Sequence, residues 1–241
     1  MRRSAQYLCQ NDFEKYPEVN RELWTITPRM MHYAFFLWCG MALLCGGCYK
    51  QSYDEVVPNI KAISNRSIVV ATHDQRPYIV SGEAKPEVVG IKRGGYGNPF
   101  LVSTASGRPL ADDMTKVICN GLQRKGFQCI PVSVMASDST DIVRRKLKET
   151  TTDLAVLLTV YQWRSDTYIR TSLEHKTTLE VFDRDGTLLA QTSVQAAKAG
   201  DVLPGVTAGV DTTHTSVPLA LKSILEELLN YPNVVTALQR S

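Results

Sequence analysis

The chain has 241 residues, and its 27 basic and 24 acidic residues leave a net charge of +3. This near balance, without long blocks of one sign, argues against nucleic acid as a partner, because nucleic-acid-binding domains usually carry a strongly basic face. The sequence has no His-Glu-x-x-His motif and no Gly-x-Ser-x-Gly elbow. We therefore predict no catalytic residue, no metal site and no cofactor.

The most distinctive segment is the apolar run 33–48, YAFFLWCGMALLCGGC. It falls short of the about 20 apolar residues that a membrane-spanning helix needs, but it matches the apolar core of a secretory signal. Because small residues precede Cys48, the run resembles a bacterial lipoprotein signal. That resemblance implies cleavage after residue 47, lipidation of Cys48 and attachment to the membrane. Tyr49, where an Asp would favour inner-membrane retention, implies the periplasmic face of the outer membrane.

Two alternatives for this run are a membrane anchor with a cytosolic head and an uncleaved buried helix. Gly46-Gly47-Cys48, followed at once by the polar run 50–55, favours lipidation over both. Residues 1–28 carry four acidic residues, which translocated leaders normally lack, so we interpret them as an over-extended gene start. We predict a signal peptide over 1–47, a lipidated flexible tether over 48–66 and a single domain over 67–241.

The periodicity of apolar residues predicts eight elements after the tether. They are a strand over 68–73, a helix over 109–125, a strand over 127–134, a helix over 139–150, strands over 153–163, 169–181 and 187–196, and a helix that Ser216 caps and Pro232 stops. The predicted fold class is α/β (α+β), a two-layer sandwich of the order β-α-β-α-β-β-β-α. It has a mixed sheet of about five strands and three helices mainly on one face.

Several of these segments together suggest a family. The lipoprotein signal, the strand ending in Asp74-Gln75-Arg76-Pro77, the helix opened by 108–112 and ended at 125–127, and the apolar strand before a charged hairpin resemble YajG-type outer-membrane lipoproteins. The resemblance implies an outer-membrane lipoprotein and brings no catalytic residues with it. The chain departs from the family layout by an insertion at 78–107.

That insertion is the predicted partner-binding segment. It contains six glycines around the sequence KRGGYGNP. A loop of about thirty residues without secondary structure is uncommon unless it has a role. Lys92, Arg93, Tyr96 and Asn98 offer cations, an aromatic ring and an amide to an anionic or glycan partner. The alternative is a surface hairpin with glycine turns.

Two further groups of residues have two interpretations each. Cys119 and Cys129 are ten residues apart and either form a disulfide in an oxidising compartment or are two small buried side chains. His73 lies beside Asp74 at a strand end, where α/β proteins often bind ligands. Neighbours on a strand point to opposite faces, however, so a structural role for His73 is the preferred interpretation.

The predicted function is a non-enzymatic module for binding or assembly. It is anchored to the membrane through its N-terminal lipid and contacts an envelope protein, cell-wall material or lipid. The alternatives are an auxiliary lipoprotein of an ABC-type lipid transport system and a lipid-anchored hydrolase of cell-wall or lipid substrates that uses His73 or His214. An enclosed apolar cavity favours the carrier, and a cleft that gathers a histidine, a carboxylate and a nucleophile favours the hydrolase. The sequence predicts no oligomeric state.

Overall fold

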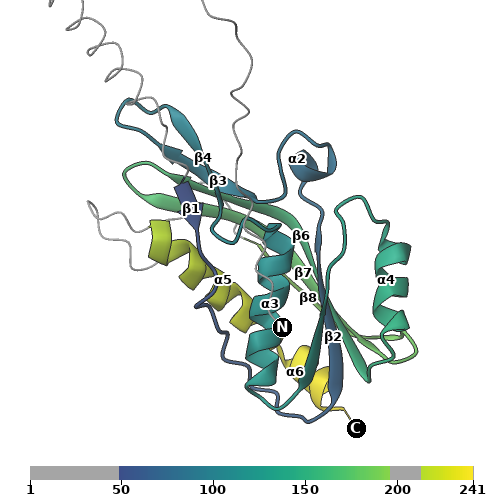
Figure 1. The fold of residues 1–241 in the computed structure, drawn as a ribbon. Coiled ribbons are helices and arrows are strands. Elements are labelled where there is room, and N and C mark those ends of the chain that lie inside the picture. Colours follow the sequence, from purple (N-terminus) through teal and green to yellow (C-terminus); the bar gives the residue numbers. More distant parts are fainter. Residues whose placement is uncertain (1–48, 196–212, 241) are drawn as a thin grey trace, which may run out of the picture. The chain divides into compact units, whose positions relative to one another are not determined.

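The computed structural model describes residues 49–195 and 213–240, with side chains in the second range from residue 216 onward (Figure 1). Cys48 and residues 196–212 lie outside these ranges. The strands are β1 (Tyr49–Gln51), β2 (Ser67–Asp74), β3 (Val88–Arg93), β4 (Pro99–Thr104), β5 (Gln128–Val132), β6 (Leu154–Thr167), β7 (Thr171–Asp183) and β8 (Leu188–Gln195). The helices are α2 (Pro77–Val80), α3 (Leu110–Gln123), α4 (Thr140–Glu149), α5 (Thr213–Leu229) and α6 (Pro232–Gln239).

All eight strands belong to one mixed sheet that is organised around β6. One edge of this 14-residue strand pairs first with β2 and then with β3, both in parallel, while its other edge pairs with antiparallel β7. Beyond these neighbours, β5 follows β2, β4 and then β1 follow β3, and β8 follows β7. A single long strand thus joins two strand sets that extend from different halves of its length.

Alternate residues of the central strands build two separate cores. Ile68 and Val70 of β2 pack with apolar residues of α3, α5 and α6, whereas Val69 and Ala71 pack with Val143 and others on the opposite face. Both faces of β2 are buried, which explains its continuous run of apolar residues. The α4 helix therefore lies on the face opposite to α3, α5 and α6.

The mixed α/β class is as predicted, but the number and order of elements are not. The predicted order omitted β1, α2, β3, β4 and α6, so the sheet has eight strands within the described residues where five were expected. Helices cover both faces of the sheet, because α4 presents Val143 and Leu147 to the second core. The predicted two-layer arrangement therefore lacks the layer that α4 forms on the second face of the sheet.

The predicted flexible tether is wrong for residues 49–62. Tyr53, Val56, Ile60 and Ala62 are buried and belong to the main core. The prediction missed them because polar residues lie between them in the sequence. Every second to fourth residue is nevertheless apolar and packs in the core that the helices cover. Residues 49–62 therefore belong to the folded unit, and β1 directly follows Cys48 in the sequence.

The insertion 78–107 folds as the short helix α2 followed by the antiparallel hairpin β3–β4. Gly90 allows this hairpin to join the sheet, because a Cβ there would lie 2.0 Å from Ser165 Oγ and 2.4 Å from Ser165 O on β6. The hairpin interpretation of the glycines is the one that the structure bears out for the backbone. The glycines predicted a hairpin with turns, but they did not predict that its strand β3 pairs with β6.

Two details near the other helices also differ from or add to the predictions. The last helix starts at Thr213, so Ser216 lies inside it and does not cap it, and Pro232 is the first residue of α6. In the structure Cys119 and Cys129 form a disulfide with a Cα–Cα distance of 5.4 Å, which links α3 to β5. Across the part of the chain described here, the helices are too short or too polar to span a bilayer.

Candidate functional site

The candidate binding residues lie at one end of the sheet, where two strand connections meet. The β3–β4 turn (residues 94–98) and the β6–β7 turn (residues 168–170) are neighbours because β3 runs parallel to the end of β6, with Lys92 opposite Thr167. The Tyr168 hydroxyl donates a hydrogen bond to the carbonyl oxygen of Gly95, 3.4 Å away. We call the exposed residues of these two turns and of the adjacent start of β4 the turn-end surface.

The four predicted contact residues share this end but do not converge on one pocket. The Lys92 ammonium lies 4.4 Å from the centre of the Tyr49 ring, a cation–π contact. Arg93 donates two hydrogen bonds to Asp166, from Nε to Oδ1 at 2.9 Å and from Nη2 to Oδ2 at 2.6 Å. The Tyr96 side chain is fully exposed, and the Asn98 carbonyl closes the turn by accepting from Gly94 N. Tyr96 is thus the residue of the four that projects furthest into solvent.

Sequence reasoning missed the second half of this surface. Tyr168 and Ile169 are 51% and 68% exposed at the tip of the β6–β7 turn, and Phe100 and Leu101 of β4 are 36% and 63% exposed. Ile169 was expected to begin the buried face of a strand, but β7 starts two residues later at Thr171. An aromatic and an aliphatic residue directly before Arg170 were the signal for an exposed amphipathic turn.

A buried ion pair supports the base of the insertion. Arg76 is fully buried, and its Nη2 lies 2.6 Å from Asp74 Oδ2 while its Nε lies 2.8 Å from Oδ1. The same guanidinium donates to the carbonyl oxygens of Val88 at 2.7 Å and Pro86 at 3.1 Å. The pKa of Arg76 is raised, because the stabilisation by Asp74 outweighs the effect of burial. The motif Asp74-Gln75-Arg76-Pro77 is therefore structural: it fixes the start of β3.

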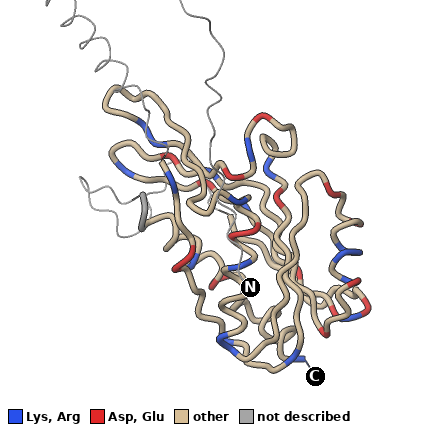
Figure 2. The backbone as a smooth tube through the Cα atoms, viewed as in Figure 1, with Lys and Arg blue, Asp and Glu red and all other residues tan. Residues whose placement is uncertain are grey.

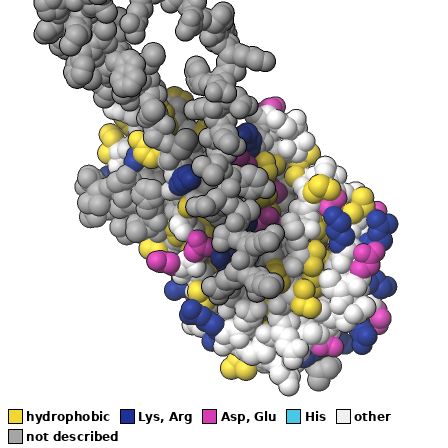
Figure 3. All heavy atoms as spheres, in the orientation of Figure 1, with side chains coloured by type: hydrophobic (Ala, Val, Ile, Leu, Met, Phe, Trp, Pro, Cys, Tyr) yellow, Lys and Arg dark blue, Asp and Glu magenta, His cyan; other side chains and the backbone are white. Residues whose placement is uncertain are grey.

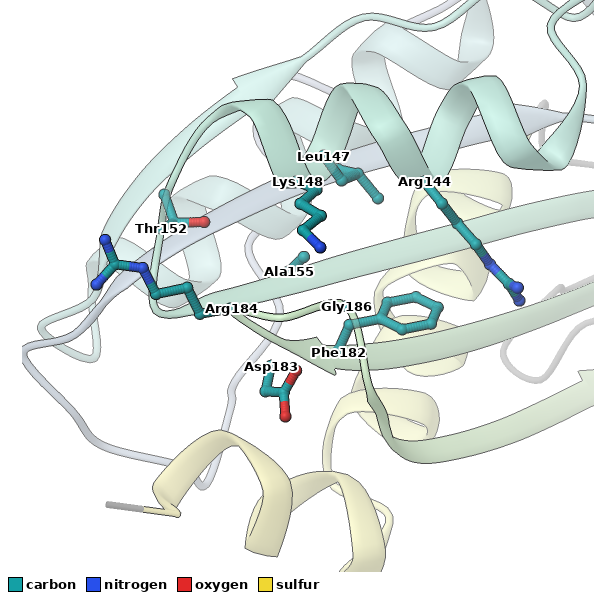
Figure 4. A pocket seen from close by; sticks show the side chains of 9 residues that line it. All are labelled: Arg144, Leu147, Lys148, Thr152, Ala155, Phe182, Asp183, Arg184 and Gly186. Atoms are coloured by element: carbon teal, nitrogen blue, oxygen red, sulfur yellow. The ribbon is translucent and has the colours of Figure 1, made fainter.

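A shallow pocket lies on the other side of the sheet, between α4 and the β7–β8 turn (Figure 4). Its floor is formed by Leu147, Ala155 and Phe182, which are also buried residues of the second core. The cavity volume is about 30 Å³, far below the roughly 300–1,000 Å³ of small-molecule sites. Arg144, Lys148 and Arg184 give this pocket a basic rim (Figure 4).

Part of that basic rim is engaged within the protein. Arg144 Nη2 lies 3.2 Å from Glu180 Oε1, and the guanidinium stands over the Phe182 ring at 5.3 Å. Asp183 also lines the pocket, but its Oδ1 accepts hydrogen bonds from the backbone of the β7–β8 turn. Around α4, on the face shown in Figure 3, cationic and anionic side chains alternate.

His73 is buried near the amino end of α4 and contacts polar groups there. The Gln75 amide lies 2.7 Å from His73 Nε2 and donates to the Ala136 carbonyl at 2.9 Å. Burial lowers the pKa of His73, although Asp138 opposes this effect. Asp138 itself accepts from Lys146 Nζ at 2.6 Å, which lowers the pKa of Asp138. These contacts occupy the groups that a His–Asp catalytic pair would use.

The other candidate sites are a metal-binding cluster and the remaining histidines. In the described ranges, no cluster of three or more His, Cys, Asp or Glu side chains has a geometry for holding a metal ion. The His214 side chain lies outside what the structure describes. On β7, the buried polar atoms His175 Nδ1 and Thr177 Oγ1 have no hydrogen-bond partner among the residues that the structure describes.

Comparisons with known proteins identify no family. No protein-family model and no curated protein matches the chain. Among solved structures, it is similar to protein XCC0632 from Xanthomonas campestris, described as DUF330, with 11% identity over 78% of this chain and 92% of that chain and a TM-score of 0.42. A PelC dodecamer from Paraburkholderia phytofirmans has 12% identity over 77% of this chain and 95% of that chain, with a TM-score of 0.38. The hypothetical protein CT253 from Chlamydia trachomatis has 10% identity over 74% of this chain and 100% of that chain, with a TM-score of 0.40. Similarities at these levels support no functional conclusion, and the likeness to YajG-type lipoproteins stays a prediction.

Proposed function

We propose that this protein is a lipid-anchored, non-enzymatic binding module of the bacterial envelope, held through Cys48 on the periplasmic face of the outer membrane. The observation that carries the proposal is the position of β1. Tyr49, the residue after the cysteine of the lipoprotein-like signal, is already paired in the sheet, so the described fold reaches up to the predicted cleavage site. Cleavage before Cys48 would therefore remove the apolar run and leave the described fold intact.

The disulfide supports export from the cytosol. Cys119 and Cys129 are joined in the structure, and disulfides form and persist mainly in oxidising compartments such as the periplasm. Cytosolic thiols are kept reduced, so an anchor with a cytosolic head would not retain this bond. The pairing therefore favours the lipoprotein interpretation over a membrane anchor with a cytosolic head.

The arrangement of polar residues favours binding over catalysis. The acidic neighbours of His73 are committed to Arg76 and Lys146, and three of the five exposed aromatic side chains among the described residues lie on the turn-end surface. Exposed aromatic residues beside cations are typical of contact surfaces. We propose that this surface binds the envelope partner.

Metabolic labelling tests the anchor. The full chain, expressed in a bacterial host with radiolabelled palmitate, is expected to incorporate label and to fractionate with the outer membrane. Cys48→Ser should abolish both, while Cys39→Ser in the same apolar run should keep both. Mass spectrometry should find Cys48 as the acylated first residue; a full-length unacylated chain would contradict the proposal.

The alternative, an auxiliary lipoprotein of a lipid transport system, requires the pocket beside α4 to widen around its ligand, because the space there is about 30 Å³. The apolar floor and basic rim offer the residue types that a single chain with an anionic head, such as an alkyl phosphate, would contact. Binding of dodecyl phosphate, measured by calorimetry below its micellar concentration, tests this candidate. We expect Lys148→Glu with Arg184→Glu to abolish binding if the pocket is the site. Arg145→Glu on the same helix should leave it unchanged.

A further inference from the structure

The direction of β1 decides where the chain enters the fold. Because β1 is parallel to β4, with Tyr49 opposite Val102, the amino end of β1 points to the end of the sheet where β4 begins. β4 begins at Pro99, directly after the β3–β4 turn. The amino end of β1 therefore lies at the same end of the sheet as the turn-end surface (Figure 1), and Cys48, the lipidated residue of the proposed function, directly precedes β1 in the sequence.

Exposed apolar side chains gather at that same end. Of the thirteen large apolar side chains that are exposed among the described residues, five belong to the turn-end surface. These five are Tyr96, Phe100, Leu101, Tyr168 and Ile169. The Phe100 ring lies 6.1 Å from that of Tyr49, so the patch continues to the start of β1. Three aromatic rings and two aliphatic side chains at two hairpin tips match the residue types that lie at a membrane–water interface.

The charges of this end are mostly positive. Lys50, Lys92, Arg93 and Arg170 lie there, against the single carboxylate of Asp166 within residues 49–50, 92–101 and 166–170. Figure 2 shows basic positions on both hairpins. Cations next to exposed aromatic residues favour contact with anionic lipid headgroups.

The short connection links these observations. A long tether would let the domain stand off from the bilayer, but the residues after Cys48 are paired in β1 and packed in the core. We infer that the turn-end surface lies on the lipid headgroups when Cys48 is acylated, with Tyr96 and Ile169 in the interface. This inference rests on the proposed function, and it replaces an unspecified partner of this surface by the bilayer itself.

Tryptophan probes test the contact. The full chain is purified from a bacterial host, its acylation is checked by mass spectrometry, and it is reconstituted into vesicles of phosphatidylethanolamine and phosphatidylglycerol. Tyr96→Trp and Ile169→Trp place probes on the surface, and Tyr231→Trp is the matched control. Tyr231 is also exposed, at the α5–α6 junction far from the hairpins in Figure 1. Cleavage of the signal removes Trp24 and Trp38, so the buried Trp163 is the background that every acylated variant shares.

We expect brominated acyl chains to quench the added tryptophans at positions 96 and 169 at least about twofold more than the one at 231, because interfacial side chains reach the acyl boundary. Iodide in the aqueous phase should show the reverse order. Arg170→Glu in the Tyr96→Trp background should weaken the bromine quenching, while Arg145→Glu on α4 should not. Acylated protein whose probes at 96 and 169 behave like that at 231 would overturn the inference alone. Unacylated protein would overturn the proposed function and this inference with it.

Discussion

Asp74 and Arg76 form an ion pair that is almost fully shielded from water, with 2.6 Å between Asp74 Oδ2 and Arg76 Nη2. Asp74 is the last residue of β2, and Arg76 follows it by two residues. Pro77 cannot donate a backbone hydrogen bond to a neighbouring strand, so the ion pair holds the chain in place where β2 ends. Through Arg76, the pair also binds the carbonyl groups of Pro86 and Val88. It thereby fixes the point from which the β3–β4 hairpin extends to the turn-end surface.

Breaking this pair should destabilise the protein strongly. Asp74→Ala leaves a buried guanidinium without its counter-ion, and the expected loss is about 3–5 kcal/mol of unfolding free energy. Urea unfolding followed by the fluorescence of Trp163 measures it. Asp54→Ala removes the partner of Lys116 in an exposed pair and should cost less than about 1 kcal/mol. Equal losses in the two variants would contradict a role for the buried pair.

The close approach of β3 and β6 predicts a difference between two glycines of the insertion. A Cβ at Gly90 would overlap the backbone of Ser165, so Gly90→Ala should cost about 1–3 kcal/mol or separate the hairpin from the sheet. Gly95 in the β3–β4 turn has no atom within 4 Å of such a Cβ, and its φ does not require glycine. Gly95→Ala should therefore leave stability within about 0.5 kcal/mol of the original. Hydrogen exchange of the β3 amides would locate the effect of the first variant.

The parts of the fold that were predictable are those in which one residue pattern decides the structure. The helix over 109–125 and the strand over 153–163 were clear because their apolar residues follow one period over a long stretch. The structure of the insertion was not predictable, because the need for glycine at position 90 arises from the close approach of Ser165, 75 residues away in sequence. For the same reason half of the turn-end surface was missed: Tyr168 becomes a neighbour of Gly95 only through strand pairing.

The disulfide should contribute to stability under oxidising conditions. Cys119 and Cys129 close a short loop between α3 and β5, and a bond of this kind typically adds about 2–4 kcal/mol. A thiol reductant should therefore lower the urea midpoint of the original protein. Cys119→Ala with Cys129→Ala should have a lower midpoint that the reductant does not change. A midpoint that is insensitive to reductant in the original protein would argue against the bond.

The buried His73 and the half-buried His175 predict that stability falls as the pH decreases from about 7 to about 5. Burial lowers the pKa of His175 and of His73, so each is protonated less readily in the folded state than in the unfolded state, where a histidine titrates near 6.5. Below that value the unfolded chain binds more protons, which favours unfolding. Each histidine can contribute a slope of at most about 1.4 kcal/mol per pH unit. Asp138 adds to the loss only in more acidic solution, because the pKa of its carboxyl is lowered.

Replacing His175 separates its contribution to the pH dependence from that of His73, and Thr177, two residues away on β7, provides the control. The expected result for His175→Phe is a shallower dependence of the unfolding free energy on pH between 5 and 7, with the remainder due to His73. Thr177→Val is the matched control, because it also removes a buried polar atom without a partner but carries no titrating group. That variant should keep the slope of the original protein while its stability is unchanged or raised by up to about 1 kcal/mol. If His175→Phe kept the full slope as well, the protonation of another group would have to account for the acid sensitivity.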